Sequence, residues 1–464
     1  MTTSNDIKIV SDLGKIVGKK NVLCRPEEII AYTTDTITRD LPVKKYSAIV
    51  FPQTTEDIVK IVKFASKAKI AIIPRGAGTN LCGACTPLEN SILMCFSKMN
   101  NILEINPTNM QATVQSGLVI ADLQKELDKF NLFFPPDPSN LAVSTIGGAV
   151  ALSSGGPKTF KYGTTKDYVL NLKVILANGE IINTATNTAK NVSGYNLTQL
   201  FVGSEGTLGI ITEITLKVIP KPQAKKIMLA YFNSLENATK AVNTVTQHQI
   251  IPAVMDLMDY NTINSIEDFY PTGLDRNAQA SLLLELHGSQ NDIKEQTETI
   301  TKIFEEYDVT SYKIANSQEE ETKLWKARRS AYGACIQIAP DILTEDIVVP
   351  RDKICEMVQA IQNIGIKYNL TINVMGHIAD GNIHPHFCLD RRNTQQYNNF
   401  QKAKDELFQI AIKLGGTLSG EHGVGCEKSN YMQQATSQIN IDLMKKIKNI
   451  FDPENILNPK KITE

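Results

Sequence analysis

The chain has no marked excess of charge of either sign. Lys and Arg together number 48 and Asp and Glu 49, which gives a formal net charge of -1. A nucleic-acid-binding surface needs a strong basic excess, so we expect no nucleic-acid partner. There is no run of about 18 apolar residues, so we expect no membrane-spanning helix. The polar segment Met1–Lys8 also lacks the apolar core of a secretory signal.

Cysteine and histidine are both scarce. The eight cysteines do not form the closely spaced run that binds an iron–sulfur cluster, so we expect no such cluster in this chain. We interpret the eight as free thiols of a cytoplasmic protein. Peripheral association of the protein with a membrane is compatible with this interpretation. One C-x-x-C pair, Cys82 and Cys85, is interpreted as incidental because no second pair follows it. None of the six histidines precedes His248.

Three of the histidines lie in two glycine-containing segments, Gly376–His384 and Ser419–Gly425. The first contains Asp-Gly, a favoured two-residue hairpin turn, and counting outward from it opposes His377 to His384. Directly opposed Cβ atoms lie about 4.5–5.5 Å apart, so the two imidazoles can share a metal ion. A single histidine in a turn is usually only polar surface; the pair makes a metal site an equal alternative, and Glu421 and His422 add support for the metal.

The second segment contains Glu421 and His422. Glu421 can add an oxygen ligand to the metal, and His422 is then suited to accept a proton beside it. His386 is expected on the same strand face as His384, as a supporting partner rather than a third ligand. His248 and His287 have no motif, and we assign them no role.

Apolar runs and helix signals alternate along the chain and predict an α+β fold. Strands are expected at 48–51, 71–73, 91–96, 110–115, 172–176, 210–218, 226–232 and 281–287. Helices are expected at 54–65, 119–130, 235–246, 290–307, 358–368 and 439–451. Pro220-Lys221-Pro222 predicts a domain boundary. After it we expect helices on one face of an antiparallel sheet.

Three stretches before residue 221 are rich in glycine and small residues. The first, Pro74–Asn80, directly follows an apolar strand, the second covers 135–164, and the third covers 200–211. Glycines let the backbone approach a ligand closely and present N–H groups to a phosphate. For the first stretch alone a tight turn is an equal alternative. Together the three predict a site for a long cofactor.

These stretches and the two histidine segments, in this order, resemble the FAD-linked D-2-hydroxyacid dehydrogenases of the vanillyl-alcohol oxidase superfamily. This group includes the glycolate oxidase flavin subunit, D-lactate dehydrogenase and D-2-hydroxyglutarate dehydrogenase. The resemblance implies a PCMH-type FAD-binding domain of two subdomains and an α+β substrate cap domain with an antiparallel sheet. It also implies a helical C-terminal tail that returns to the FAD domain. The expected divisions are a helical lead-in at 1–45, the FAD domain at 46–220, the cap domain at 221–425 and the tail at 426–464.

The resemblance assigns FAD binding to the glycine-rich stretches and to one tail residue. The implied residues are Arg75, Gly76, Ala77, Gly78, Thr79, Asn80, Asp137, Pro138, Ser139, Thr145, Gly147, Gly148, Gly155, Gly156, Tyr162, Gly163, Thr164, Gly206, Ile210, Ile211 and Asn458. Some relatives attach FAD covalently through a histidine in the first stretch. This chain has no histidine there, so we expect noncovalent FAD.

The resemblance also assigns the chemistry of the cap domain. It implies that His377, His384 and Glu421 bind a divalent metal, and the ligand types suit zinc, iron and manganese alike. His422 is the implied base, and Arg328, in Trp325-Lys326-Ala327-Arg328, is the implied partner of the substrate carboxylate. Without the resemblance Arg328 would be interpreted as a solvated helix cation. The implied reaction is oxidation of a 2-hydroxyacid by hydride transfer to the flavin.

The substrate and the electron acceptor are less well defined by the sequence. Relatives that use dicarboxylates carry a lysine where this chain has Thr344, which favours D-lactate or glycolate over the alternative, D-2-hydroxyglutarate. The expected electron acceptor is an electron-transfer flavoprotein, an iron–sulfur subunit, a quinone or a cytochrome. A homodimer and a heteromeric complex both remain open. Two other classes are a metal-dependent hydrolase, which leaves the glycine stretches unexplained, and a flavoprotein that only relays electrons.

Overall fold

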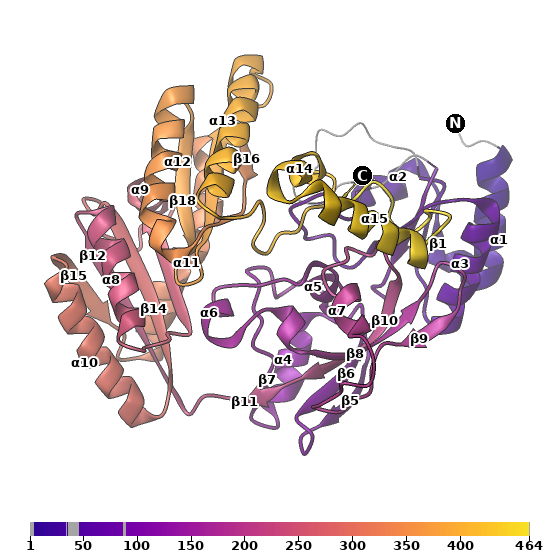
Figure 1. Ribbon diagram of the computed structural model, residues 1–464, viewed down its shortest axis with the longest axis horizontal. Helices are drawn as coiled ribbons and strands as arrows, with labels where there is room; N and C mark the ends of the chain where they lie inside the picture. Colours follow the sequence, from indigo (N-terminus) through magenta and orange to yellow (C-terminus); the bar gives the residue numbers. More distant parts are fainter. Residues whose placement is uncertain (1–3, 34, 36–45, 87–89, 464) are drawn as a thin grey trace. The chain divides into compact units, whose positions relative to one another are not determined.

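The computed structural model describes residues 4–33, 35, 46–86 and 90–463, and it divides into two compact units (Figure 1). Unit 1 comprises Met1–Gly155, Thr164–Lys221 and Glu421–Glu464, and unit 2 comprises Gly156–Gly163 and Pro222–Gly420. Parts of the predicted lead-in, residues 1–3, 34 and 36–45, lie outside the described residues. The predicted domain limits stay a prediction.

The first sheet of unit 1 has four strands in the order β1-β2-β4-β3. Strands β2, β4 and β3 are parallel, and β1 is antiparallel to β2. The strands are β1 (Val22–Leu23), β2 (Ala48–Val50), β3 (Ile72–Arg75) and β4 (Ile92–Cys95). The helices of this region are α1 (Ser4–Val17), α2 (Pro26–Ile29) and α3 (Thr55–Ala68). Helix α3 begins where the sequence predicts, because Thr54 and Asp57 form a reciprocal capping box.

The second sheet of unit 1 is antiparallel, with strand order β5-β6-β10-β8-β9. Its strands are β5 (Ile102–Asn106), β6 (Gln111–Gln115), β8 (Val169–Ile175), β9 (Ile181–Asn183) and β10 (Ile210–Lys217), and a separate pair joins β7 (Leu132–Phe133) to β11 (Ile219–Pro220). The accompanying helices are α4 (Ile120–Asp128), α5 (Ile146–Leu152) and α7 (Leu197–Phe201).

The C-terminal segment also belongs to unit 1. It contains α14 (Met432–Ala435) and α15 (Gln438–Phe451). Beyond α15 the chain pairs with β3, where Ile72 N donates to Ile456 O at 2.7 Å and Asn458 N donates to Ile72 O at 2.9 Å. The predicted return of the tail is therefore confirmed.

Unit 2 is built on one antiparallel sheet with strand order β15-β12-β14-β13-β18-β19-β16, and β17 also pairs with β19. The strands are β12 (Ala224–Phe232), β13 (Val254–Asp259), β14 (Ala280–Gly288), β15 (Val309–Ile314), β16 (Asp341–Thr344), β17 (Ile347–Val348), β18 (Thr371–His377) and β19 (Asn382–Leu389). The helices are α6 (Thr159–Tyr162), α8 (Leu235–Gln247), α9 (Tyr260–Phe269), α10 (Gln290–Glu306), α11 (Gln318–Ile338), α12 (Ile354–Tyr368) and α13 (Thr394–Lys413).

Helices cover both faces of this sheet, so the expectation of one covered face is wrong. Ile227 and Leu229 of β12 pack with Ala331 of α11 in one apolar cluster, which also contains residues of α9. The even-numbered residues of β12 point to the opposite face, where the ring centroids of Phe232 and Phe304 of α10 lie 5.7 Å apart. Strand side chains alternate between the two faces, and both are apolar here. In Figure 1, α12 and α13 lie side by side in unit 2.

The antiparallel sheets and mixed helices confirm the predicted α+β class. All eight cysteines are free thiols, as the sequence suggests. In the part of the chain that the structure describes, no helix has the length and apolar character needed to cross a membrane.

Candidate active site

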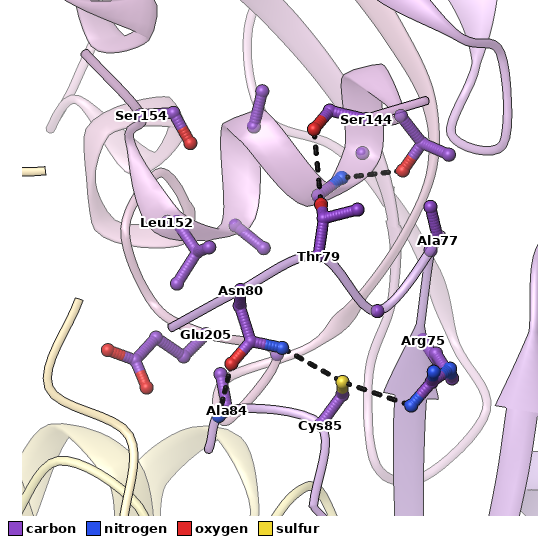
Figure 2. Close-up of a pocket in the computed structure, with 18 of the residues that line it drawn as sticks. Arg75, Ala77, Thr79, Asn80, Ala84, Cys85, Ser144, Leu152, Ser154 and Glu205 are labelled. Carbon is purple, nitrogen blue, oxygen red and sulfur yellow. Dashed lines mark hydrogen bonds between the residues drawn. The ribbon is translucent and has the colours of Figure 1, made fainter. Parts of the chain in front are cut away.

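Unit 1 contains an open pocket with an empty volume of about 1160 Å³ (Figure 2). All three glycine-rich stretches contribute to its lining, so the pocket can take an extended ligand. Most of the residues predicted to bind the cofactor line it. They are Arg75, Gly76, Ala77, Gly78, Thr79, Asn80, Pro138, Ser139, Thr145, Gly147, Gly148, Gly206 and Ile211. Glu421 and His422 line the same pocket.

The loop that follows β3 is closed by the side chain of Asn80. Its Oδ1 accepts from Ala84 N at 3.0 Å, and its Nδ2 donates to Cys85 Sγ at 2.9 Å, as Figure 2 shows. Among the described residues, none accepts a hydrogen bond from the backbone N–H groups of residues 76–79. Successive N–H groups that have no partner in the chain are suited to bind a phosphate.

A second wall of the pocket is the start of α5. Thr145 caps this helix by accepting from Gly148 N at 3.2 Å, and the preceding Ser144 bonds Thr79 Oγ1 at 3.1 Å (Figure 2). A Cβ at Gly147 would lie 2.6 Å from the Cβ of Ser116 and 2.7 Å from its carbonyl oxygen. The chain therefore needs glycine at 147 to pass this close to β6.

The loop that carries His422 is held by a buried carboxylate. Glu205 Oε1 accepts from Val424 N at 2.7 Å, and Oε2 accepts from Gly425 N at 2.9 Å. Burial raises the pKa of the Glu205 carboxyl, and these two hydrogen bonds oppose the rise. Asn458 Nδ2 donates to the carbonyl oxygens of Glu205, at 2.6 Å, and of Ala84. Asn458 thus links two residues that line the pocket through their carbonyl oxygens.

The other predicted cofactor residues do not line this pocket. Ile210 is buried in the apolar core around α3, and Thr164 N donates to Asp167 Oδ2 at 2.8 Å. Asp137 directly precedes the lining residue Pro138, and Gly155 lies just after α5. Gly156, Tyr162 and Gly163 belong to unit 2, where the Tyr162 hydroxyl bonds His287 Nδ1 at 2.8 Å.

In unit 2 the histidine hairpin forms, but its predicted register is wrong. The loop has four residues, and His377 opposes Asn382 while His384 opposes Met375. Ile378 does not pair within the hairpin, because its N–H donates to Met255 O on β13 at 3.0 Å. The two histidines are diagonal neighbours on one face of the sheet, and their ring centroids lie 5.1 Å apart. The predicted proximity therefore survives the change of register.

Two buried aspartates contact these histidines. Asp256 of β13 directly opposes His377, and its Oδ1 lies 2.7 Å from His377 Nδ1. Its Oδ2 lies 2.7 Å from Nε of Arg328 on α11. Burial raises the pKa of the Asp256 carboxyl, but the charges of Arg328 and His377 outweigh this and the pKa lies below its usual value.

Asp346 lies on the other side of the pair, with its Oδ1 3.6 Å from His384 Nδ1. Asn382 Nδ2 donates to Oδ1 at 2.7 Å, and Ser419 Oγ and Gly420 N donate to Oδ2 at 2.7 and 2.8 Å. Asp346 therefore fixes the end of unit 2 that directly precedes Glu421 in the chain.

His386 contacts Thr344, the position that the sequence connects with substrate size. Its Nδ1 bonds Thr344 Oγ1 at 2.8 Å, and its ring lies 5.8 Å from Tyr332 of α11. His386 shares a strand face with His384, as predicted, since the two are separated by one residue of β19.

Sequence reasoning assigned no role to Asp256, Asp346 or Glu205. The sequence nevertheless indicates that each has a structural role, because a charged residue in or beside an apolar or glycine-rich run must find a partner when it is buried. Asp256 interrupts the apolar strand Val254–Met258, Asp346 directly precedes the apolar run Ile347–Val349, and Glu205 lies between Gly203 and Gly206. The partners themselves are distant in sequence, so a single chain does not reveal them.

Comparison with known proteins gives consistent matches along the chain. Residues 46–185 match the family model described as "FAD binding domain", and residues 221–462 match "FAD linked oxidases, C-terminal domain". Glycolate oxidase subunit GlcD of Bacillus subtilis is 44% identical over 89% of this chain and 88% of its own length. D-lactate dehydrogenase of Anaerostipes hadrus is 32% identical over 88% of each.

A solved structure shows the same fold. p-Cresol methylhydroxylase aligns with a TM-score of 0.83 and 18% identity, over 100% of this chain and 98% of its own. With both domain models matched and relatives aligned along most of its length, the chain belongs to the FAD-linked oxidase family of the vanillyl-alcohol oxidase superfamily, in the group that contains glycolate oxidase subunits and D-lactate dehydrogenases.

Proposed function

We propose that this protein oxidises a small D-2-hydroxyacid, D-lactate or glycolate, to the corresponding 2-oxoacid. The names of its relatives, glycolate oxidase subunit and D-lactate dehydrogenase, support this substrate class. The observation that carries the proposal is that Glu421 and His422 line the same pocket as the glycine loops. FAD, held noncovalently in that pocket, supplies the acceptor for the hydride that leaves the substrate.

The pocket in unit 1 fits an extended phosphate-bearing cofactor. Support comes from the backbone N–H groups of residues 76–79, which have no acceptor among the described residues, and from the close backbone approach at Gly147. The loop Arg75–Asn80 is the proposed pyrophosphate site, where these N–H groups bind the negative charge. Asn458 and Glu205 support the pocket wall through the hydrogen bonds described above.

His377, His384 and Glu421 are the proposed ligands of a divalent metal, zinc, iron or manganese. The ring separation of 5.1 Å between the two histidines supports a shared ion. Glu421 is joined by one peptide bond to Gly420, whose N–H is bonded to Asp346 beside His384. When bound, such an ion supplies a Lewis acid that stabilises negative charge on the substrate oxygen.

His422 is the proposed base, and Arg328 is the proposed partner of the substrate carboxylate. A neutral imidazole can accept the hydroxyl proton of a substrate, and His422 lines the pocket proposed for the cofactor. The Arg328 guanidinium uses Nε toward Asp256, and its Nη2 remains for the substrate carboxylate.

The size of the substrate is proposed from Thr344. No cation stands at this position, and Thr344 Oγ1 is bonded to His386 Nδ1. A second substrate carboxylate would gain no lysine partner here, which favours D-lactate or glycolate over D-2-hydroxyglutarate. Electrons are proposed to pass to a partner protein or a quinone, and the relatives named as subunits support a partner. A cytoplasmic location is also proposed, from the eight free thiols.

Steady-state kinetics with an artificial electron acceptor test the proposal. We expect kcat/KM for D-lactate or glycolate to exceed that for D-2-hydroxyglutarate, and turnover to require bound FAD. Purified protein that binds FAD but oxidises none of the three acids would contradict the proposed activity. A preference for D-2-hydroxyglutarate would contradict the role given to Thr344.

A further inference from the structure

One buried carboxylate joins a proposed metal ligand to the proposed substrate-binding arginine. Asp256 is 1% exposed, and each of its oxygens has a different partner at 2.7 Å, His377 Nδ1 for Oδ1 and Arg328 Nε for Oδ2. The three side chains come from β13, β18 and α11, so the contact joins two strands of the sheet and the helix that covers them.

The contact with His377 determines which ring nitrogen is available. A carboxylate that accepts from Nδ1 holds the proton on that nitrogen and leaves the Nε2 lone pair for a metal. It also fixes the rotation of the ring, because His377 is nearly buried beside His384. Without Asp256 the ring could turn or carry its proton on Nε2, and either change removes the ligand.

The contact with Arg328 orients the guanidinium in the same way. Asp256 engages Nε, and Nη1 lies 3.0 Å from Met375 Sδ, so two of the three guanidinium nitrogens are held by residues of β13 and β18. Nη2, the third nitrogen, remains for the substrate carboxylate. A single residue thus sets the direction of two groups that act on different parts of one substrate.

We propose that Asp256 is a positioning residue that aligns His377 for metal binding and Arg328 for the substrate carboxylate. This inference rests on the proposed function, because it takes His377 as a ligand and Arg328 as a substrate contact. It adds a residue outside the histidine and Trp-x-x-Arg motifs and links the two motifs through one carboxylate.

The test compares Asp256→Asn and Asp256→Glu with wild type in the full-length FAD-loaded protein. Zinc or manganese is removed and added back, and the metal stoichiometry and Kd are measured by competition with a chelator. We expect Asp256→Asn to raise the metal Kd by about 10–100-fold, the usual effect of losing such a support. The KM for the hydroxyacid should also rise, while FAD content stays unchanged. Asp256→Glu, which keeps the carboxylate, should recover part of the metal affinity.

Asp259→Asn is the matched control. Asp259 lies on the same strand and is equally buried, but it accepts from Thr262 N and Val374 N rather than from His377 or Arg328. It should therefore leave the metal Kd unchanged.

Three results would overturn the inference. The first is a wild-type metal Kd in Asp256→Asn. The second is an equal loss of metal in Asp259→Asn, which would show a general effect on the strand. The third is a wild-type protein that binds neither metal, which would refute the proposed metal site itself and is distinct from the other two. If Asp256→Asn does not fold, Asp256→Glu decides, because a wild-type Kd and KM in that longer variant contradict the alignment.

Discussion

Replacing Glu205 with Gln should detach the loop that carries His422 from the cofactor pocket. The carboxylate accepts from Val424 N and from Gly425 N through separate oxygens. Gln offers one acceptor oxygen and one NH₂ donor, so one backbone N–H loses its acceptor and faces another donor. The side chain remains the same size, so the change removes hydrogen bonding and charge while the packing is kept.

The size of the effect follows from these contacts. A hydrogen bond to a charged group contributes about 1.5–3 kcal/mol, and Glu205 is 5% exposed, so little water is available to replace it. If the lost free energy destabilises the bound position of the loop that carries His422, fewer molecules hold the loop in that position. The fraction that does so falls by about 10–150-fold, since each 1.4 kcal/mol is tenfold. We expect kcat/KM to fall by up to that factor.

The assay is the oxidation of D-lactate or glycolate, expressed per bound FAD. Because Glu205 also lines the pocket, the FAD content of each preparation must be measured separately. Glu213→Gln is the control, since Glu213 stands on β10 and forms a half-exposed ion pair with Lys173 at 2.7 Å. Such a pair contributes about 0–1 kcal/mol, so this variant should retain nearly full turnover.

Two outcomes would refute the reasoning on Glu205. One is a Glu205→Gln variant with full FAD and unchanged kcat/KM. The other is a loss of activity that follows FAD loss completely, because Glu205 would then act through the cofactor and not through the loop that carries His422.

Three further predictions follow from other sites. His422→Ala should lower kcat by about 10²–10⁴-fold with FAD retained, and unchanged turnover per bound flavin would contradict its role as base. Gly147→Ala should lower the unfolding free energy by about 1–3 kcal/mol, because its Cβ would lie 2.6 Å from Ser116 Cβ in an overpacked site; chemical denaturation tests this, and an unfolding free energy equal to that of wild type would contradict it. Burial raises the pKa of Asp259 from 3.8 to about 6, so the stability that this carboxyl contributes is complete below its unfolded value and is lost as the pH rises through 6. Asp259→Asn does not titrate, so the unfolding free energy of the variant relative to wild type should increase by about 3 kcal/mol from acid to neutral pH, and a constant difference would contradict the raised pKa.

Local signals predicted the parts of the fold that depend on neighbours in sequence. The capping box at Thr54 fixed the start of α3, and the apolar runs at β4, β10 and β12 became strands within one or two residues of the expected ends. Strands β13, β15 and β16 were missed. In β13 the acidic residues Asp256 and Asp259 reduce the apolar signal, and only their distant partners make the strand stable.

The histidine pair shows the same limit at the candidate site. The Asp380-Gly381 turn signal brought His377 and His384 together correctly, but the two-residue turn it predicted is replaced by a four-residue loop. The cause is the hydrogen bond from Ile378 N to Met255 O, a contact more than a hundred residues away in the chain. The family motifs likewise pointed to Arg328 and gave no sign that its Nε is occupied by Asp256.

The central claim is that a D-2-hydroxyacid reduces FAD bound to this chain, and the visible absorption of the bound flavin measures it directly. On anaerobic addition of D-lactate or glycolate to the purified protein, we expect the flavin absorption to bleach, with no bleaching by L-lactate. A bound flavin that stays oxidised with both acids, yet is bleached by a chemical reductant, would contradict the account.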